Sequence, residues 1–166
     1  MFKNKPILTN VTLMRHPTTN PISSQRIITV GFIAGTLDGA AAVIILAKFK
    51  FAATFKYIAS AFFGKAAFAG GMEMIIAGIF FHYLIAFSFS LFYAILLNRL
   101  RFLNTNKLIY GILYGLFVWV IMNLIVVPLT LIPSVNFNLE KAIINAVILI
   151  FCIGLPISLF LPRWKN

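Results

Sequence analysis

The sequence predicts an all-α membrane protein with four transmembrane helices and an interfacial amphipathic helix between the first and the second. Three observations support this fold class. Hydrophobic residues make up 61% of the 166 positions and charged residues only 10%, whereas a soluble domain has roughly 45–50% and 25%. Four apolar runs are each long enough to cross a hydrocarbon core of about 30 Å. The basic residues flank these runs instead of forming one block.

The first transmembrane helix is predicted at residues 27–47, a run whose single charged residue is Asp38. Residues 1–26 combine basic residues with three prolines and several Thr, Asn and Ser. This composition buries too little apolar surface to offset the entropy lost on ordering. We therefore expect a mobile, basic cytoplasmic tail, followed by one four-helix transmembrane domain over residues 27–166.

The interfacial helix is predicted at residues 51–63, inside a Phe-rich segment that four lysines interrupt. A lysine at the centre of a span costs roughly 2.5–3.5 kcal/mol, which argues against a crossing here. Apolar residues nevertheless recur at helical spacing, which favours a helix lying in the membrane plane: Phe51, Phe55, Ile58, Ala59 and Phe62.

The remaining spans are predicted at residues 72–97, 108–132 and 141–161, the last two carrying Pro128 and Pro156. With four spans both termini lie on one side of the membrane. Nine Lys and Arg residues fall on that side and five on the other. The excess of positive charge predicts that both termini are cytoplasmic.

Two series of glycines lie at intervals of four residues, and each series lines one helix face. They are Gly31, Gly35 and Gly39 in the first span, and Gly111 and Gly115 in the third. Small residues at this spacing let helix backbones approach closely. Because both series lie at a similar depth, we predict that the first and third spans pack together in the cytoplasmic half. A homodimer interface is the alternative.

Asp38 and His82 are the most informative polar residues, because depth counting places both near the middle of the membrane. Such groups are costly unless they are paired, neutralised or hydrated. The two are predicted to form a buried polar centre, which Asn123 and Asn145 extend outward. One interpretation is a proton-titrating or ligand-binding site. The other is a structural polar pair that holds two helices together.

The motifs of several enzyme classes are missing from the sequence. It contains no Gly-rich phosphate loop, no zinc-protease motif, no CxxC and no nucleophile elbow. We expect a non-enzymatic protein with no cofactor and no metal site, whose basic residues interact with membrane lipids and not with nucleic acid. Two alternatives stay open: an accessory subunit that docks another membrane protein through its glycine faces, and a lipid-acting enzyme with a bilayer-facing cavity lined by Asp38 and His82.

Four stretches also carry a family resemblance: residues 31–38, residues 57–60 with 64–68, residues 82–87, and residues 122–129. They resemble the YagU-like family of uncharacterised bacterial inner-membrane proteins, over roughly residues 27–161. The resemblance implies a four-helix protein of the bacterial inner membrane, with family motifs at Asp38, His82, Asn123 and Pro128. It implies a shared polar site and no particular reaction.

Overall fold

The computed structural model describes residues 22–132 and 138–162, with the side chain of residue 101 left aside. Within these residues every regular element is a helix and none is a strand. Four helical segments are long and apolar enough to cross a membrane: Ser24–Leu46, Met72–Arg99, Lys107–Leu129 and Leu139–Phe160. The predicted fold class is confirmed, and the chain is a multi-pass membrane protein.

The first span consists of α1 (Ser24–Ala41) and a π-helical end, η1 (Ala42–Leu46). It begins three residues before the predicted start, because the Ser23 side chain accepts a hydrogen bond from the Arg26 amide at 3.4 Å and caps the helix. Most of the predicted tail, residues 1–21, lies outside the described residues.

The second span is α4 (Met72–Arg99), and a 3₁₀ turn, η2 (Arg101–Asn104), leads from it to the third. The third consists of α5 (Lys107–Val120), the π-helical η3 (Ile121–Val126) and α6 (Val127–Leu129). The fourth consists of α7 (Leu139–Leu149), the π-helical η4 (Ile150–Gly154) and α8 (Leu155–Phe160).

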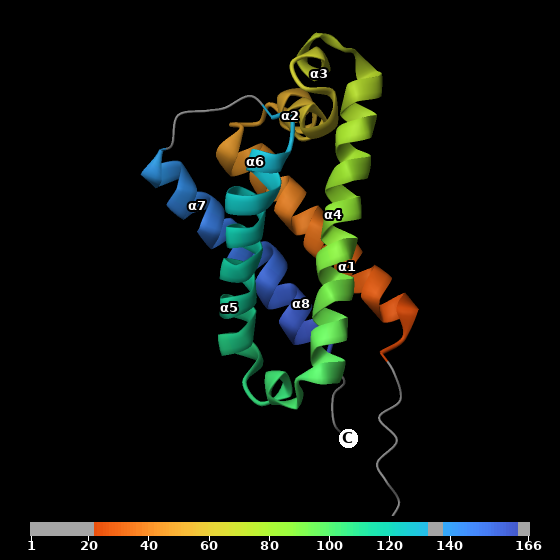
Figure 1. Ribbon diagram of the computed structural model, residues 1–166, viewed down its shortest axis with the longest axis vertical. Coiled ribbons are helices and arrows are strands. Elements are labelled where there is room, and N and C mark those ends of the chain that lie inside the picture. The colour runs from red at the N-terminus through yellow and green to blue at the C-terminus, as the bar shows by residue number, and fades with distance from the viewer. Residues whose placement is uncertain (1–21, 133–137, 163–166) are drawn as a thin grey trace, which may run out of the picture.

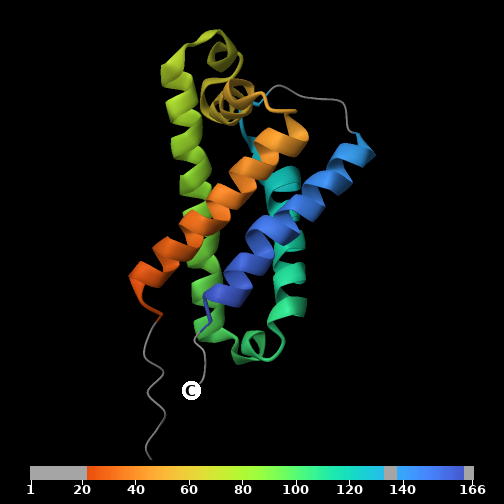
Figure 2. The same ribbon diagram turned by 180° about the vertical axis from the view of Figure 1, so that it is seen from behind.

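The interfacial segment forms α2 (Phe51–Phe63), with the predicted bounds, and a short helix that was not predicted, α3 (Ala66–Ala69). Gly64 separates them in a left-handed conformation with φ of 56°, which glycine adopts without steric cost. Both helices lie across one end of the bundle, whereas the start of α1, η2 and the end of α8 lie towards the other end (Figures 1 and 2). We call these the α2 end and the η2 end.

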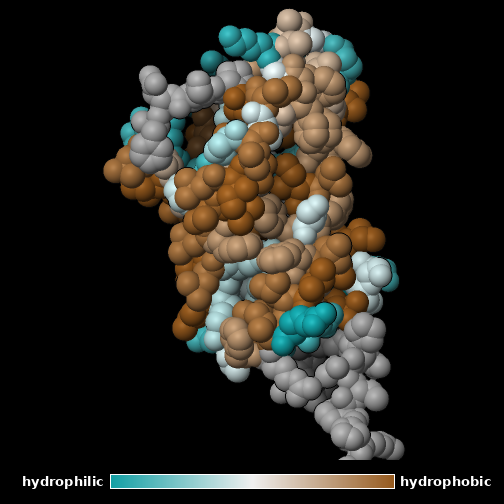
Figure 3. All heavy atoms as spheres, in the orientation of Figure 1, coloured by the Kyte–Doolittle hydropathy of each residue, from teal (hydrophilic) through white to brown (hydrophobic). Residues whose placement is uncertain are grey.

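The four spans differ in tilt, since α4 and α5 run along the long axis while α1 and the α7–α8 span cross it obliquely (Figures 1 and 2). Hydrophobic residues cover most of the middle of the face in Figure 3, and strongly hydrophilic residues gather towards its two ends. This distribution is the one that a hydrocarbon layer between two polar interfaces requires.

Two prolines explain where two of the π-helical segments lie. Pro128 follows η3 and Pro156 follows η4, each within two residues. A proline inside a helix has no amide hydrogen, and its ring clashes with the carbonyl four residues earlier. A locally widened helical turn relieves this clash while the span continues.

The predicted packing of the first span on the third is wrong. The α1 glycines instead face α4, where a Cβ added to Gly31 would lie 2.6 Å from the Phe87 ring. The α5 glycines face the fourth span, where a Cβ on Gly115 would lie 2.5 Å from the Ile150 Cα. Equal depth does not make two helices neighbours: each glycine series packs on a span that runs antiparallel to its own.

Candidate functional site

Asp38 is half-buried in the bundle, in the half nearer the α2 end. It is fourteen residues from the start of α1, which corresponds to about 21 Å along the helix axis. Its carboxylate is close enough to His82 of α4 and Cys152 of η4 to interact electrostatically with each. It therefore lies where the first, second and fourth spans meet.

The Asp38 carboxylate accepts no hydrogen bond from any residue in the described part of the chain. Asp38 therefore lies near His82, as predicted, but the two side chains do not form a hydrogen bond. A carboxylate usually has several acceptor positions filled by donors when it is away from water. At Asp38, no donor among the described residues fills these acceptor positions.

The His82 imidazole bonds to backbone instead. Its Nε2 lies 2.7 Å from the Gly35 carbonyl oxygen. Because a carbonyl oxygen can only accept, Nε2 carries the hydrogen, and the neutral ring therefore presents Nδ1 as an acceptor. Gly39, one turn further along α1, leaves room for the ring, since a Cβ there would lie 3.0 Å from Nε2.

Further polar groups, which the sequence alone did not connect, join α1 to α4. The Tyr83 hydroxyl lies 2.9 Å from the Thr36 hydroxyl, and Ser90 donates to the Ile27 carbonyl at 3.0 Å. The spacing of residues 83 and 90 by seven, two helical turns, places both on the α4 face that meets α1. The spacing of Tyr83 and Ser90 could have been noticed in the sequence, but it does not indicate that their hydrogen-bond partners are Thr36 and Ile27.

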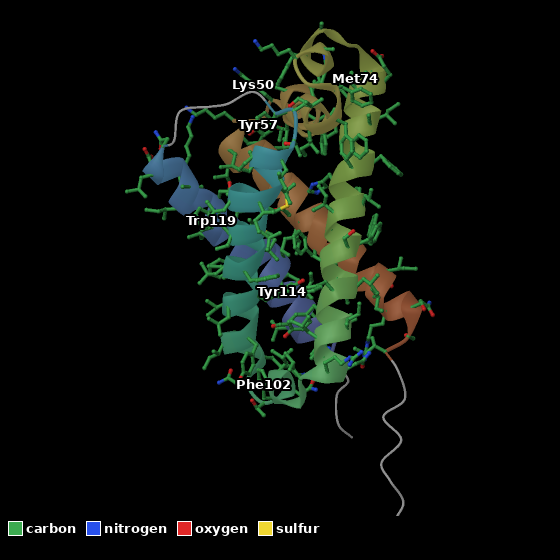
Figure 4. All side chains as sticks on the ribbon, in the orientation of Figure 1. Lys50, Tyr57, Met74, Phe102, Tyr114 and Trp119 are labelled. Atoms are coloured by element: carbon green, nitrogen blue, oxygen red, sulfur yellow. The ribbon has the colours of Figure 1, made fainter. Side chains whose placement is uncertain are left out.

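A second polar seam lies nearer the η2 end, between the other spans. The Tyr114 hydroxyl of α5 donates to the Phe89 carbonyl of α4 at 2.6 Å, and Figure 4 shows this side chain between the two helices. Ser158 of α8 donates to the Lys107 carbonyl at 2.6 Å. In both bonds the acceptor is backbone, so residue types alone did not reveal them.

The two asparagines do not join the centre through hydrogen bonds. Asn123 donates to the Trp119 carbonyl of its own span at 2.9 Å. Asn145 is half-buried in α7 and makes no hydrogen bond with the described residues. The structure thus brings Asp38 and His82 together and adds Cys152, while Asn123 and Asn145 make no hydrogen bond to them.

A pocket of about 330 Å³ lies beside His82, between α1, η1, α2 and α4. Its lining includes His82 and Tyr83 but not Asp38. The hypothesis of a lipid-acting enzyme requires a cavity lined by both Asp38 and His82. This pocket is lined by His82 alone of the two. Among the described residues no three His, Cys, Asp or Glu side chains lie close enough to hold a metal ion.

Comparisons with known proteins return no match: neither a family model, nor a curated protein, nor a solved structure is similar to this chain. The resemblance to the YagU-like family therefore stays a prediction.

Proposed function

We propose that this membrane protein holds an exchangeable proton at a centre formed by Asp38 and His82. The observation that carries the proposal is the imbalance of donors and acceptors at the centre. The carboxylate oxygens and the imidazole Nδ1 are all acceptors, whereas the one imidazole hydrogen is already donated to the Gly35 carbonyl. A proton is the smallest species that supplies the missing donor.

The position of Asp38 within a membrane-spanning segment adds an energetic reason. An unpaired charge inside a membrane span costs several kcal/mol, so ionisable residues there commonly mark proton relays or ligand sites. Asp38 would bind the proton, and His82, held in one orientation by its bond to Gly35, would receive or supply it through Nδ1. Asp38 lies in α1 four residues before the π-helical η1 begins, and Cys152 lies in η4. Such widened turns are frequent at functional sites.

The proposed orientation places the η2 end, and with it both termini, in the cytoplasm. Nine of the fourteen Lys and Arg residues belong to that side of the chain, as the positive-inside rule requires. The resemblance suggests the bacterial inner membrane as the location. A protein of this kind acts by binding and releasing a proton and is not an enzyme.

A structural role is the second candidate, favoured by the bond from His82 to the Gly35 backbone and by the close approach of α1 to α4 at its glycines. In this role the chain would be an accessory subunit, and Asp38 and His82 would only hold the first two spans together. The stabilities of Asp38→Asn, His82→Gln and the double variant test it. A structural clamp requires both single variants to lose stability and their effects to be non-additive.

Infrared spectroscopy of the full chain in lipid, titrated over roughly pH 4 to 8, tests the proton site. A protonated carboxyl shows a C=O stretch that its anion lacks. The described residues hold only three carboxyl side chains, Asp38, Glu73 and Glu140. We expect a pH-dependent band that disappears in Asp38→Asn.

The matched controls are Glu73→Gln and Glu140→Gln, which should retain that band. Identical spectra for the parent and Asp38→Asn would overturn the proposal. Where the band is assigned to Asp38, proton flux into proteoliposomes, measured for the parent and Asp38→Asn, then separates transport from static binding.

A further inference from the structure

We infer that the pocket beneath α2 binds the acyl chain of one anionic phospholipid, whose phosphate lies on Lys48 and Lys50. This site is independent of the proton at Asp38, which is not part of the pocket lining. Its volume of about 330 Å³ lies at the lower end of the range found for small-ligand pockets, roughly 300–1,000 Å³.

The pocket has the chemistry of an acyl-chain site. Its lining residues from η1 and α2 are Val43, Ile44, Phe51 and Phe55. The polar lining groups deeper along α1 are already hydrogen-bonded within the protein: Thr36 pairs with Tyr83, and His82 with Gly35. A methylene chain can therefore occupy the pocket without breaking these two hydrogen bonds.

The pocket opens towards the membrane and has a suitable length. Thr36, Ala40, Ile44 and Phe51 line it and are themselves exposed at the surface of the bundle. Residues 35 to 44 of the first span extend along it, which corresponds to about 13 Å of helix. Half of a hydrocarbon core measures about 15 Å. A chain that enters at the level of α2 would thus lie in the pocket over most of one leaflet.

The rim of the pocket supplies the charge that a phosphate requires. The chain folds back after η1, where the Phe49 amide donates to the carbonyl of Val43, a lining residue, at 2.8 Å. Lys48 and Lys50 flank Phe49, are exposed, and form no ion pair with the described residues. Figure 4 shows Lys50 at the α2 end, directed away from the bundle. Both ammonium groups are therefore available at headgroup level.

Local charge favours an anionic lipid over a zwitterionic one. Five lysines and two glutamates lie at the α2 end: Lys48, Lys50, Lys56, Lys65, Lys141, Glu73 and Glu140. Of these, Glu73 accepts a hydrogen bond from the Gly71 amide at 2.6 Å and interacts with Lys56. The rim lysines are left without a carboxylate of their own.

Native mass spectrometry of the detergent-solubilised full chain, titrated with phosphatidylglycerol or phosphatidylcholine, tests the inference. We expect one phosphatidylglycerol to bind before any phosphatidylcholine. In Lys48→Gln/Lys50→Gln its affinity should fall by about 30-fold, since each lysine near a phosphate contributes about fivefold. The control Lys65→Gln/Lys141→Gln removes the same charge from the same end, away from the rim, and should change affinity less than twofold.

Filling the pocket tests where the chain lies. Ala40→Phe replaces an exposed lining residue by a side chain that occupies the pocket, and should abolish the tight binding of one lipid. Ile44→Trp repeats the test at a second exposed lining position if Ala40→Phe does not fold. Equal losses in the two lysine pairs would show diffuse attraction and overturn the inference. Full binding by a folded pocket-filling variant, or equal affinity for the two lipids, would also overturn it.

Discussion

Gly78→Ala should detach α2 from α4, because Gly78 is where their backbones touch. A Cβ at this position would lie 1.9 Å from the Phe55 carbonyl oxygen and 2.6 Å from the Phe55 carbonyl carbon. Ordinary van der Waals contact begins at 3.4 Å, so the α2 backbone must recede by about 1.5 Å. Phe55 is buried on α4, and the neighbouring Phe62 ring stacks on Phe81 with centroids 3.9 Å apart. The shift would disturb both contacts.

Two opposing free-energy terms set the magnitude. Overpacking a well-packed contact costs typically 1–3 kcal/mol and occasionally more, whereas alanine favours a helix over glycine by about 1 kcal/mol. The obstructing atoms are backbone, which cannot rotate away as a side chain can. We therefore take an overpacking cost of about 3 kcal/mol, the upper end of this range. After the gain of about 1 kcal/mol in helix propensity is subtracted, Gly78→Ala should lower the free energy of unfolding by about 2 kcal/mol.

The assay is unfolding of the detergent-solubilised chain by added SDS, followed by helical circular dichroism. Gly70→Ala is the matched control: its Cβ would meet the Met74 Cγ at 2.3 Å, a flexible side chain that can move aside, so stability should hardly change. Hydrogen exchange locates the effect, with faster exchange of α2 amides and unchanged exchange in α5. Equal stability of Gly78→Ala and the parent would refute the close contact of α2 with α4.

Four further outcomes follow from the same contacts. Asp38→Asn should unfold at the same or a higher SDS fraction than the parent, since the carboxylate accepts no hydrogen bond from the described residues; a clear loss would favour the structural clamp. Gly115→Ala should lose about 2 kcal/mol by overpacking, because its Cβ would lie 2.5 Å from the Ile150 Cα. Tyr83→Phe removes the bond to Thr36 and should lose only about 0.6 kcal/mol, the average for hydrogen bonds between transmembrane helices. In a Cys152→Ala background, a membrane-impermeant maleimide applied to intact cells should label Lys65→Cys and not Ser23→Cys; the reverse pattern would invert the proposed orientation.

The sequence by itself determined the number of spans and the interfacial helix. Span length follows from the thickness of the hydrocarbon core, and both the length and the hydrophobicity of a run are properties of consecutive residues. The apolar spacing from Phe51 to Phe63, with lysines on either side, likewise sufficed to predict α2 with its observed bounds. Counting residues also placed Asp38 and His82 at depths from which they can interact.

Only the tertiary structure decided which helix faces meet. Glycine spacing shows that a face permits close approach, but it does not name the partner, and so α1 packs on α4 rather than on the third span. The partner of His82 is a backbone carbonyl, at Gly35. Every residue carries such a carbonyl, and only the relative placement of two helices selects one. The pocket beneath α2 arises in the same way, because its walls come from three helices whose arrangement no single segment encodes.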